Sequence, residues 1–231
     1  LGKRDLLGVV WGPLTEAELG LSDGSLPTIR AVSCVLDALQ PLSDAWRQLM
    51  GFAANYYQRS LGEVALAALP PALRDLDVTQ LARRLKRSDK RKASADSGDS
   101  GGEDRAPEAI ALSDEQRAVL AEFDAQAGPF LLFGATGSGK TEVYLHAVQD
   151  LLARDPLAQA LVMVPEINLT PQLEARFTER FAPLYGAAAV VSMHSGMTNP
   201  QRLQSWLSAH QGPSNGGARI VLGTRMAVMA S

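Results

Sequence analysis

The stretch Phe130–Leu145, FLLFGATGSGKTEVYL, joins a short apolar run to a glycine-rich loop and then to the start of a helical pattern. The loop fits G-x-x-x-x-G-K-[ST], the pattern in which backbone N–H groups surround a phosphate chain. Glycine permits this close approach because it has no side chain and tolerates unusual backbone angles. The pattern predicts that the whole loop binds a nucleotide, through Gly134, Ala135, Thr136, Gly137, Ser138, Gly139, Lys140 and Thr141.

Two residues at the end of the loop carry its chemistry. The helix is predicted to begin near Lys140, so its free N–H groups and the positive end of its dipole face the phosphates. We expect the Lys140 ammonium to reach the β- and γ-phosphates and the Thr141 hydroxyl to ligate Mg²⁺. The alternative is an ordinary glycine turn before a helix, but a chance match in a chain of this length has a frequency on the order of 1%.

The composition is that of an ordinary globular protein of 231 residues, with 46% hydrophobic residues and a net charge of −3. This charge gives no hint of nucleic-acid binding, which must rest on local features. One cysteine, Cys34, and three histidines exclude a disulfide framework and leave no set of zinc ligands. We expect Cys34 to be buried. No apolar run approaches about 18 residues, so we expect no membrane segment and a cytoplasmic protein.

Residues 1–75 are expected to form a small α/β module. Two β-rich runs, Leu6–Trp11 and Ile29–Leu36, are predicted strands. A helix is predicted over Asp44–Arg59 with Ser43 as its N-cap, and a shorter helix over Leu61–Leu69.

Some aromatic and basic residues of this module can be interpreted in two ways. The helix face that includes Trp46, Met50 and Tyr57 is expected to be core, and a base-stacking platform is the alternative. Lys3 and Arg4 precede the first predicted strand, where they either contact DNA phosphates or mark a solvated strand end.

Residues 76–107 differ in character from both flanks. Basic residues dominate 83–92, and a tract rich in Ser, Gly and Asp follows over 94–104. Apolar residues become scarce, which predicts a flexible charged linker. The basic run either lies against DNA or is simply a solvated part of the linker.

From residue 108 a second domain is expected. Ser113 is a predicted N-cap, and Gln116 completes a capping box three residues later. Beyond it, strands alternate with helices of about 10–15 residues, which predicts a parallel sheet with helices on both faces. The predicted strands are Phe130–Phe133, Leu161–Val164, Ala188–Met193 and Arg219–Leu222, and the predicted helices are Thr141–Ala153, 170–181 and 200–210, the last with Asn199 as its cap.

In a parallel sheet the site lies at the carboxyl ends of the strands. Polar and glycine residues follow the predicted strands at Pro165-Glu166-Ile167, His194-Ser195-Gly196 and Gly223-Thr224-Arg225. Several such ends form a long active edge rather than the single pocket of a small-molecule kinase. A P-loop ATPase also needs acidic residues at a later strand end, and no predicted strand ends in Asp-Glu.

Four segments together resemble the PriA family of primosomal replication-restart helicases, also called primosomal protein N′. They are GATGSGKTEVYL at 134–145, LVMVPEINLTPQL at 161–173, MHSGMTNPQRLQSWL at 193–207 and RIVLGTRMAV at 219–228. The N-terminal module is similar to the family's 3′-DNA-binding domain in Gly2-Lys3-Arg4, in Ala54-Asn55-Tyr56-Tyr57 and in Leu61-Gly62-Glu63-Val64.

The resemblance implies the first RecA-like P-loop lobe of a superfamily 2 helicase over 108–231, preceded by a partial 3′-DNA-binding domain over 1–75. It implies a DNA-dependent ATPase and 3′→5′ helicase that uses ATP and Mg²⁺. Lys140 and Thr141 are then the phosphate and Mg²⁺ contacts, and Gln116 resembles a glutamine that reads adenine. DNA contacts are expected near the N-terminus and in motif Ia-like and Ib-like segments, at Lys3, Arg4, Glu166, Thr170, Gly223, Thr224 and Arg225.

The resemblance also implies partners. These are forked and single-stranded DNA, other primosome proteins, the single-strand DNA-binding protein and the loader of the replicative helicase. Zinc is expected in longer members of the family, whose cysteine-rich region has no counterpart within residues 1–231.

The chain departs from the family pattern in other places as well. The start of the 3′-DNA-binding domain, the winged-helix domain, the Asp-Glu-Glu-His motif and the second helicase lobe have no counterpart in this sequence. We therefore expect a fragment that binds ATP and DNA but lacks the residues for hydrolysis. The alternative is a non-catalytic module for DNA binding or partner docking with a remnant P-loop.

Overall fold

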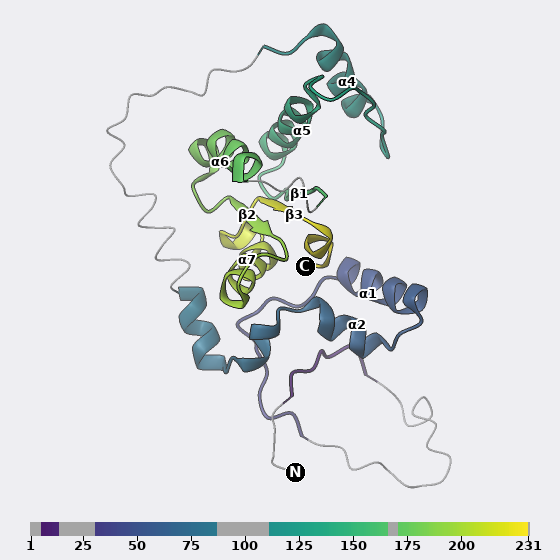
Figure 1. The fold of residues 1–231 in the computed structure, drawn as a ribbon. Coiled ribbons are helices and arrows are strands. Elements are labelled where there is room, and N and C mark those ends of the chain that lie inside the picture. The colour runs from purple at the N-terminus through teal and green to yellow at the C-terminus, as the bar shows by residue number, and fades with distance from the viewer. Residues whose placement is uncertain (1–5, 14–30, 87–110, 166–170, 231) are drawn as a thin grey trace, which may run out of the picture.

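The structure is a computed structural model that describes residues 6–13, 31–86, 111–165 and 171–230. A small parallel sheet lies between helices, with an N-terminal group of helices packed beside it (Figure 1). The strands are β1 (Ala160–Met163), β2 (Val190–Met193) and β3 (Ile220–Gly223), in the order β1-β3-β2. Met163 and Met193 both pair with Gly223, so the carboxyl ends of the strands lie at one edge.

Strand β3 is buried along its whole length because helices cover both faces of the sheet. Its side chains alternate between two cores, as the two-residue period of a strand requires. Ile220 and Leu222 pack with helices α5 (Lys140–Arg154) and α6 (Pro171–Tyr185), whereas Val221 packs on the opposite side with α7 (Asn199–Gln211). The predicted α/β fold, a parallel sheet with helices on both faces, is confirmed.

Side-chain caps explain where the helices begin. Ser43 Oγ accepts a hydrogen bond from the Trp46 N–H at 3.1 Å at the start of α1 (Asp44–Tyr57). Capping boxes open α2 (Leu61–Ala68), α4 (Asp114–Ala125) and α7. The predicted caps Ser43 and Ser113 are confirmed, but α7 is capped by Thr198 and the predicted cap Asn199 is its first helical residue. Short 3₁₀ helices are η1 (Pro71–Asp75), η3 (Pro213–Asn215) and η4 (Arg225–Met229).

The N-terminal helices and the sheet region share one hydrophobic core. Trp46 of α1 and Leu73 of η1 lie in the same buried cluster as Leu203 and Trp206 of α7. The Trp46 indole N–H also donates to the Met229 carbonyl of η4 at 3.1 Å. The two parts of the chain therefore pack through a continuous apolar interior.

The beginning of the predicted linker is a helix. Residues 78–86 are helical, Leu81 is fully buried in the shared core, and Leu85 packs against it. A flexible linker is therefore wrong for these residues, because one face of a helix buries the two leucines while Arg83 and Lys86 stay in solvent. Residues 87–107 lie outside the described residues.

The predicted strand Leu6–Trp11 is not a strand in the structure. Its alternate side chains Leu7, Val9 and Trp11 pack against the shared core, whereas Leu6 and Val10 face solvent. The alternating pattern thus belongs to an extended segment that packs on one side without a ladder partner among the described residues.

The described part of the predicted strand Ile29–Leu36, residues 31–36, is not a strand either. Val32 and Val35 are largely exposed. Cys34 is exposed as well, so the expectation that it is buried is wrong. An apolar composition alone predicts burial only if another element covers the segment, and residues 31–35 are all exposed, whereas Leu36 packs against the shared core.

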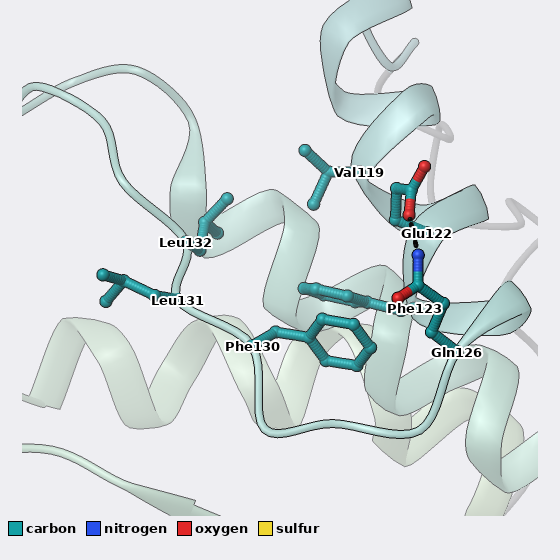
Figure 2. Close-up of a pocket in the computed structure, with 7 residues that line it drawn as sticks. All are labelled: Val119, Glu122, Phe123, Gln126, Phe130, Leu131 and Leu132. Carbon is teal, nitrogen blue, oxygen red and sulfur yellow. Dashed lines mark hydrogen bonds between the residues drawn. The ribbon is translucent and has the colours of Figure 1, made fainter.

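The predicted strand before the phosphate loop, residues 130–133, lies outside the sheet. Leu131 and Phe133 are 92% and 94% exposed, and the segment pairs with no described strand. Phe130 instead packs on Phe123 of α4 with ring centroids 4.8 Å apart, and both rings line a shallow hollow between α4 and the segment (Figure 2). A strand needs a neighbouring strand to which its backbone can hydrogen-bond. Residues 130–133 pair with none of β1, β2 and β3.

Candidate nucleotide-binding site

The glycine-rich loop leads directly into α5, as the sequence predicts. Lys140 Nζ donates to the carbonyl oxygens of Gly134 and Ala135, each at 2.6 Å. A backbone hydrogen bond from Ser138 N–H to the Ala135 carbonyl, 3.2 Å long, closes the turn. The ammonium of Lys140 is thereby held inside the loop, in a position where phosphate oxygens would compete with the two carbonyls for its protons.

The backbone of the loop requires its glycines. Gly137 and Gly139 have φ angles of +85° and +79°, in the left-handed region that residues with a Cβ rarely adopt. A Cβ at Gly139 would collide with the Gln116 amide, and a Cβ at Gly134 would lie 2.7 Å from Ser138 Oγ. Gly139 also gives α5 no side-chain cap, so the first N–H groups of this helix are open to an anion.

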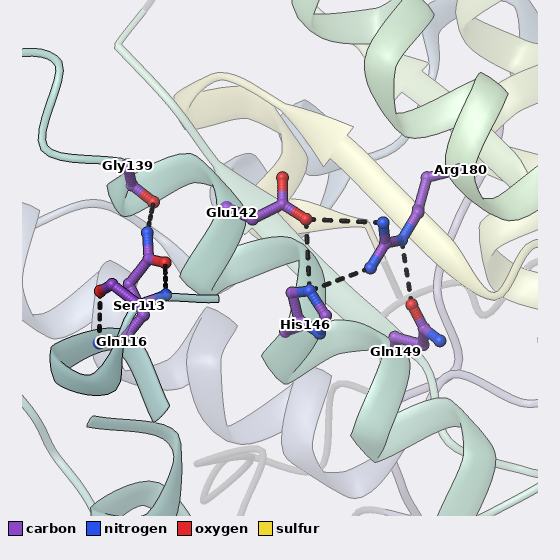
Figure 3. A network of polar contacts seen from close by, with 7 residues as sticks. All are labelled: Ser113, Gln116, Gly139, Glu142, His146, Gln149 and Arg180. Atoms are coloured by element: carbon purple, nitrogen blue, oxygen red, sulfur yellow. Dashed lines mark hydrogen bonds and ion pairs between the residues drawn. The ribbon is translucent and has the colours of Figure 1, made fainter. Parts of the chain in front are cut away.

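Gln116 contacts both its own helix start and the loop. Its Oε1 accepts from the Ser113 N–H at 2.9 Å, and its Nε2 donates to the Gly139 carbonyl at 3.3 Å (Figure 3). The capping box predicted from sequence is confirmed. The second contact places the Gln116 side chain against the phosphate loop. Contact of this side chain with the adenine of a bound nucleotide stays a prediction.

An ion pair holds α4 against the far end of α5. Arg154 and Asp124 lie 2.7 Å apart, and the hydrogen bond and charge of Asp124 raise the pKa of Arg154. Both side chains are exposed, so the pair contributes little to stability. The pair is a second side-chain contact of α4, besides the contact of Gln116 with Gly139.

A buried polar network joins α5 to α6 directly behind the loop (Figure 3). The Glu142 carboxylate, next to Thr141 in sequence, lies 3.5 Å from Arg180 of α6 and 3.3 Å from His146 Nε2. Arg180 also donates to Gln149 Oε1 at 3.0 Å and lies 3.1 Å from the same His146 Nε2. Arg180 is thus a cation within ion-pair distance of the buried Glu142 carboxylate.

This network was not among the predicted site residues. The available signal is the four-residue spacing of Glu142 and His146, which puts both on one helix face. Arg180 lies on a different helix, and no spacing in the sequence indicates that it meets them.

The carboxyl ends of the three strands bring part of the predicted active edge together. Gly223 is buried beside Met193, and Thr224 is only 3% exposed while its N–H donates to the Met193 carbonyl at 3.1 Å. Arg225, which begins η4, is exposed. His194, which follows β2, lies 3.8 Å from Glu174 of α6. Among the three motif Ib-like residues, Arg225 is the one whose side chain reaches the surface.

The remaining predicted DNA contacts cannot be placed. Lys3, Arg4, Glu166 and Thr170 lie outside the described residues.

Within the described ranges no three His, Cys, Asp or Glu side chains gather as metal ligands. No helix in the described part of the chain is long and apolar enough to cross a bilayer.

Comparison with known families agrees with this geometry. A model described as DEAD/DEAH box helicase matches residues 113–230, just over half of the chain.

The chain belongs to the DEAD/DEAH box helicase family.

A second family model, the 3′DNA-binding domain (3′BD), matches residues 1–70. The helicase region and the DNA-binding module are the two parts on which the resemblance to PriA rests, and that resemblance is confirmed.

Several similar proteins are named replication restart protein PriA. The one from Bacillus subtilis (strain 168) is 38% identical over 128 residues, which is 53% of this chain and 14% of the relative. The Haemophilus influenzae protein is 44% identical over 99 residues, 43% of this chain and 12% of the relative. The Treponema pallidum protein is 31% identical over 209 residues, 89% of this chain and 28% of the relative. The chain thus spans less than a third of the length of these relatives.

Proposed function

We propose that this chain provides the nucleotide-binding and DNA-contacting part of an ATP-dependent 3′→5′ DNA helicase of replication restart. The observation that carries the proposal is the loop geometry: the Lys140 ammonium is held between the Gly134 and Ala135 carbonyls, beside the uncapped start of α5. The match to a 3′DNA-binding domain supports DNA as the second ligand. The name of the relatives supports replication restart as the process.

Each predicted site residue has a role in this proposal. Lys140 binds the β- and γ-phosphates of ATP, Thr141 ligates Mg²⁺, and the N–H groups from Gly134 to Gly139 cradle the phosphate chain. Gln116 contacts the adenine. ATP supplies the phosphoryl bond whose hydrolysis drives strand separation in the complete enzyme.

The DNA contacts follow from the polar strand ends and the N-terminal module. The residues proposed to contact single-stranded DNA are Glu166 and Thr170 of the motif Ia-like segment and Gly223, Thr224 and Arg225 of the motif Ib-like segment. Lys3 and Arg4 are proposed to contact phosphates from the module. Binding through the backbone is expected to be independent of sequence and sensitive to salt. The proposed substrate is forked DNA, and the proposed partners are primosome proteins, the single-strand DNA-binding protein and the helicase loader, in the cytoplasm.

We further propose that residues 1–231 on their own bind nucleotide and hydrolyse it negligibly. A P-loop holds the phosphates, but hydrolysis needs acidic residues that position Mg²⁺ and the attacking water. The Asp-Glu-Glu-His motif that would supply them does not occur in this sequence.

The proposal is tested by titrating the protein with a fluorescent ATP analogue in Mg²⁺. Lys140→Ala should weaken binding about tenfold or more, because it removes charge-assisted hydrogen bonds to the phosphates. Lys86→Ala is the matched control, since Lys86 is an exposed lysine on the helix at 78–86, and it should bind like the wild type. Equal binding by wild type and Lys140→Ala would instead favour the non-catalytic module with a remnant loop.

A further inference from the structure

Helix α1 exposes three aromatic side chains next to one another. Phe52, Tyr56 and Tyr57 are 65%, 70% and 67% exposed. The Phe52 and Tyr56 rings are stacked with centroids 5.8 Å apart and an interplanar angle of 23°, and Tyr57 meets Tyr56 edge-on at 5.0 Å. We call these three residues the aromatic ridge.

The ridge has no role in the core of the protein. The buried residues of the same helix are Trp46, Met50, Ala53 and Ala54. Tyr57, which the sequence pattern predicts on that buried face, is the last residue of α1 and lies in solvent instead. Clustered exposed aromatic rings mark interaction surfaces more often than they stabilise a fold.

The charged residues nearest the ridge along the chain suit an anionic partner. No acidic residue occurs between Asp44 and Glu63. Asp44 is ion-paired with Arg47, and Glu63 caps α2 by accepting from the Ser60 N–H at 3.3 Å. The first charged residue after the ridge is Arg59, which is exposed and lines a shallow hollow of about 340 Å³ with Glu63.

This combination fits single-stranded nucleic acid better than an apolar protein surface. Unpaired bases stack on aromatic rings whatever their sequence, and a neighbouring guanidinium contacts the phosphates. A purely hydrophobic partner would gain nothing from two phenolic hydroxyls in solvent or from an arginine at the end of the ridge. The ridge also lies within residues 1–70, the part of the chain that matches a 3′DNA-binding domain.

We propose that the aromatic ridge is a base-stacking platform for single-stranded DNA, with Arg59 contacting the backbone at its edge. This inference rests on the proposed function, which identifies the ligand as DNA. It adds the surface that holds the bases. Every base can stack on an aromatic ring, so the platform binds the strand independently of its sequence.

The test measures fluorescence anisotropy of a labelled thymidine oligonucleotide of about 12 residues with the 231-residue protein. Tyr56→Leu/Tyr57→Leu should bind about tenfold more weakly, because two bases lose their stacking partners. Leucine is a good helix former, and both positions are exposed, so the variant should fold. Leu157→Ala, at a position 66% exposed, is the control for removing an exposed apolar side chain and should bind like the wild type.

Two further readouts separate stacking from charge. An abasic oligonucleotide has the same phosphates without bases, so it should bind the wild type and the double variant equally weakly. The slope of log affinity against log salt should be the same for the wild type and the double variant, and shallower for Arg59→Gln, because only arginine releases counterions from the phosphates.

The outcomes separate the ridge from the proposed function. If the wild type binds thymidine DNA and the double variant binds it equally well, the platform is wrong while DNA binding by this chain stands. If the wild type binds no single-stranded DNA, the proposed DNA-contacting function fails and the platform fails with it. If the double variant changes the sedimentation of the protein but not its DNA affinity, the ridge is a contact between copies of the chain and the proposal is overturned.

Discussion

At the scale of single residues, Gln116 links the start of a helix to the phosphate loop. One end of its amide accepts from the Ser113 N–H at 2.9 Å, and the other donates to the Gly139 carbonyl at 3.3 Å. The sequence offered a cap and an adenine contact as alternative interpretations. The structure shows that the cap leaves Nε2 available to the loop, so one role does not exclude the other. The spacing of Ser113 and Gln116 predicted the cap because capping is local, whereas the contact with Gly139 depends on how α4 packs.

The two roles of Gln116 separate in the variant Gln116→Glu. A glutamate keeps the acceptor for Ser113 N–H, so the stability of the protein should change by less than about 0.5 kcal/mol. It loses the amide donor beside Gly139, so the preference for an ATP analogue over a GTP analogue should fall. Ser113→Ala should do the opposite, destabilising α4 by about 1 kcal/mol with base preference unchanged. Thermal unfolding and paired titrations measure both, and an unchanged preference in Gln116→Glu would leave Gln116 as a cap alone.

At the scale of elements, α5 and α6 are joined by a buried ion pair in addition to their shared apolar core. The side chains of Glu142 and Arg180 are 7% and 11% exposed and lie 3.5 Å apart. Burying either ion alone is costly, so each fixes the position of the other. Glu142 follows the Mg²⁺-ligand candidate Thr141 in sequence, so the pair sets how the helix behind the loop sits against α6.

A double-mutant cycle tests this pairing. Glu142→Leu and Arg180→Met should each destabilise the protein by about 2–4 kcal/mol, because each leaves a buried charge without its partner. The double variant should be more stable than the sum of the two losses by at least about 1 kcal/mol. Urea unfolding gives the four free energies. The exposed pair Asp114–Arg117 is the control and should show a coupling energy below about 0.5 kcal/mol. If the losses of stability in the two single variants simply add in the double variant, Glu142 and Arg180 do not act as a pair.

The elements also show where sequence patterns succeed and fail. Helices α1 and α5 and the capped start of α4 were predicted closely because caps, glycines and apolar spacing are encoded within each helix. The run at 130–133 has a strand's composition, yet Leu131 and Phe133 are exposed because a strand also needs a neighbour. The helix at 78–86 was not predicted, because its basic residues suggested a linker. It forms because Leu81 is buried against other elements, which its own sequence does not show.

At the scale of the whole molecule, the N-terminal module and the sheet region are joined by a common interior. Trp46 lies 3% exposed in one cluster with Trp206 and donates to the Met229 carbonyl, and the His210 ring lies 2.9 Å from the Gln40 carbonyl. The sequence pattern predicts two modules separated by a linker, because contacts between residues far apart in the chain leave no periodic signal in it. In the structure, the exposed face of α1 and the nucleotide loop belong to one packed body.

The central claim is that this chain holds nucleotide through its P-loop but lacks the acidic residues that drive hydrolysis. The most direct measurement is phosphate release from ATP and Mg²⁺ by the purified 231-residue protein, with and without forked DNA. The account predicts release no faster than that of Lys140→Ala in either condition, although the wild type binds the ATP analogue. Robust DNA-stimulated release that Lys140→Ala abolishes would contradict it.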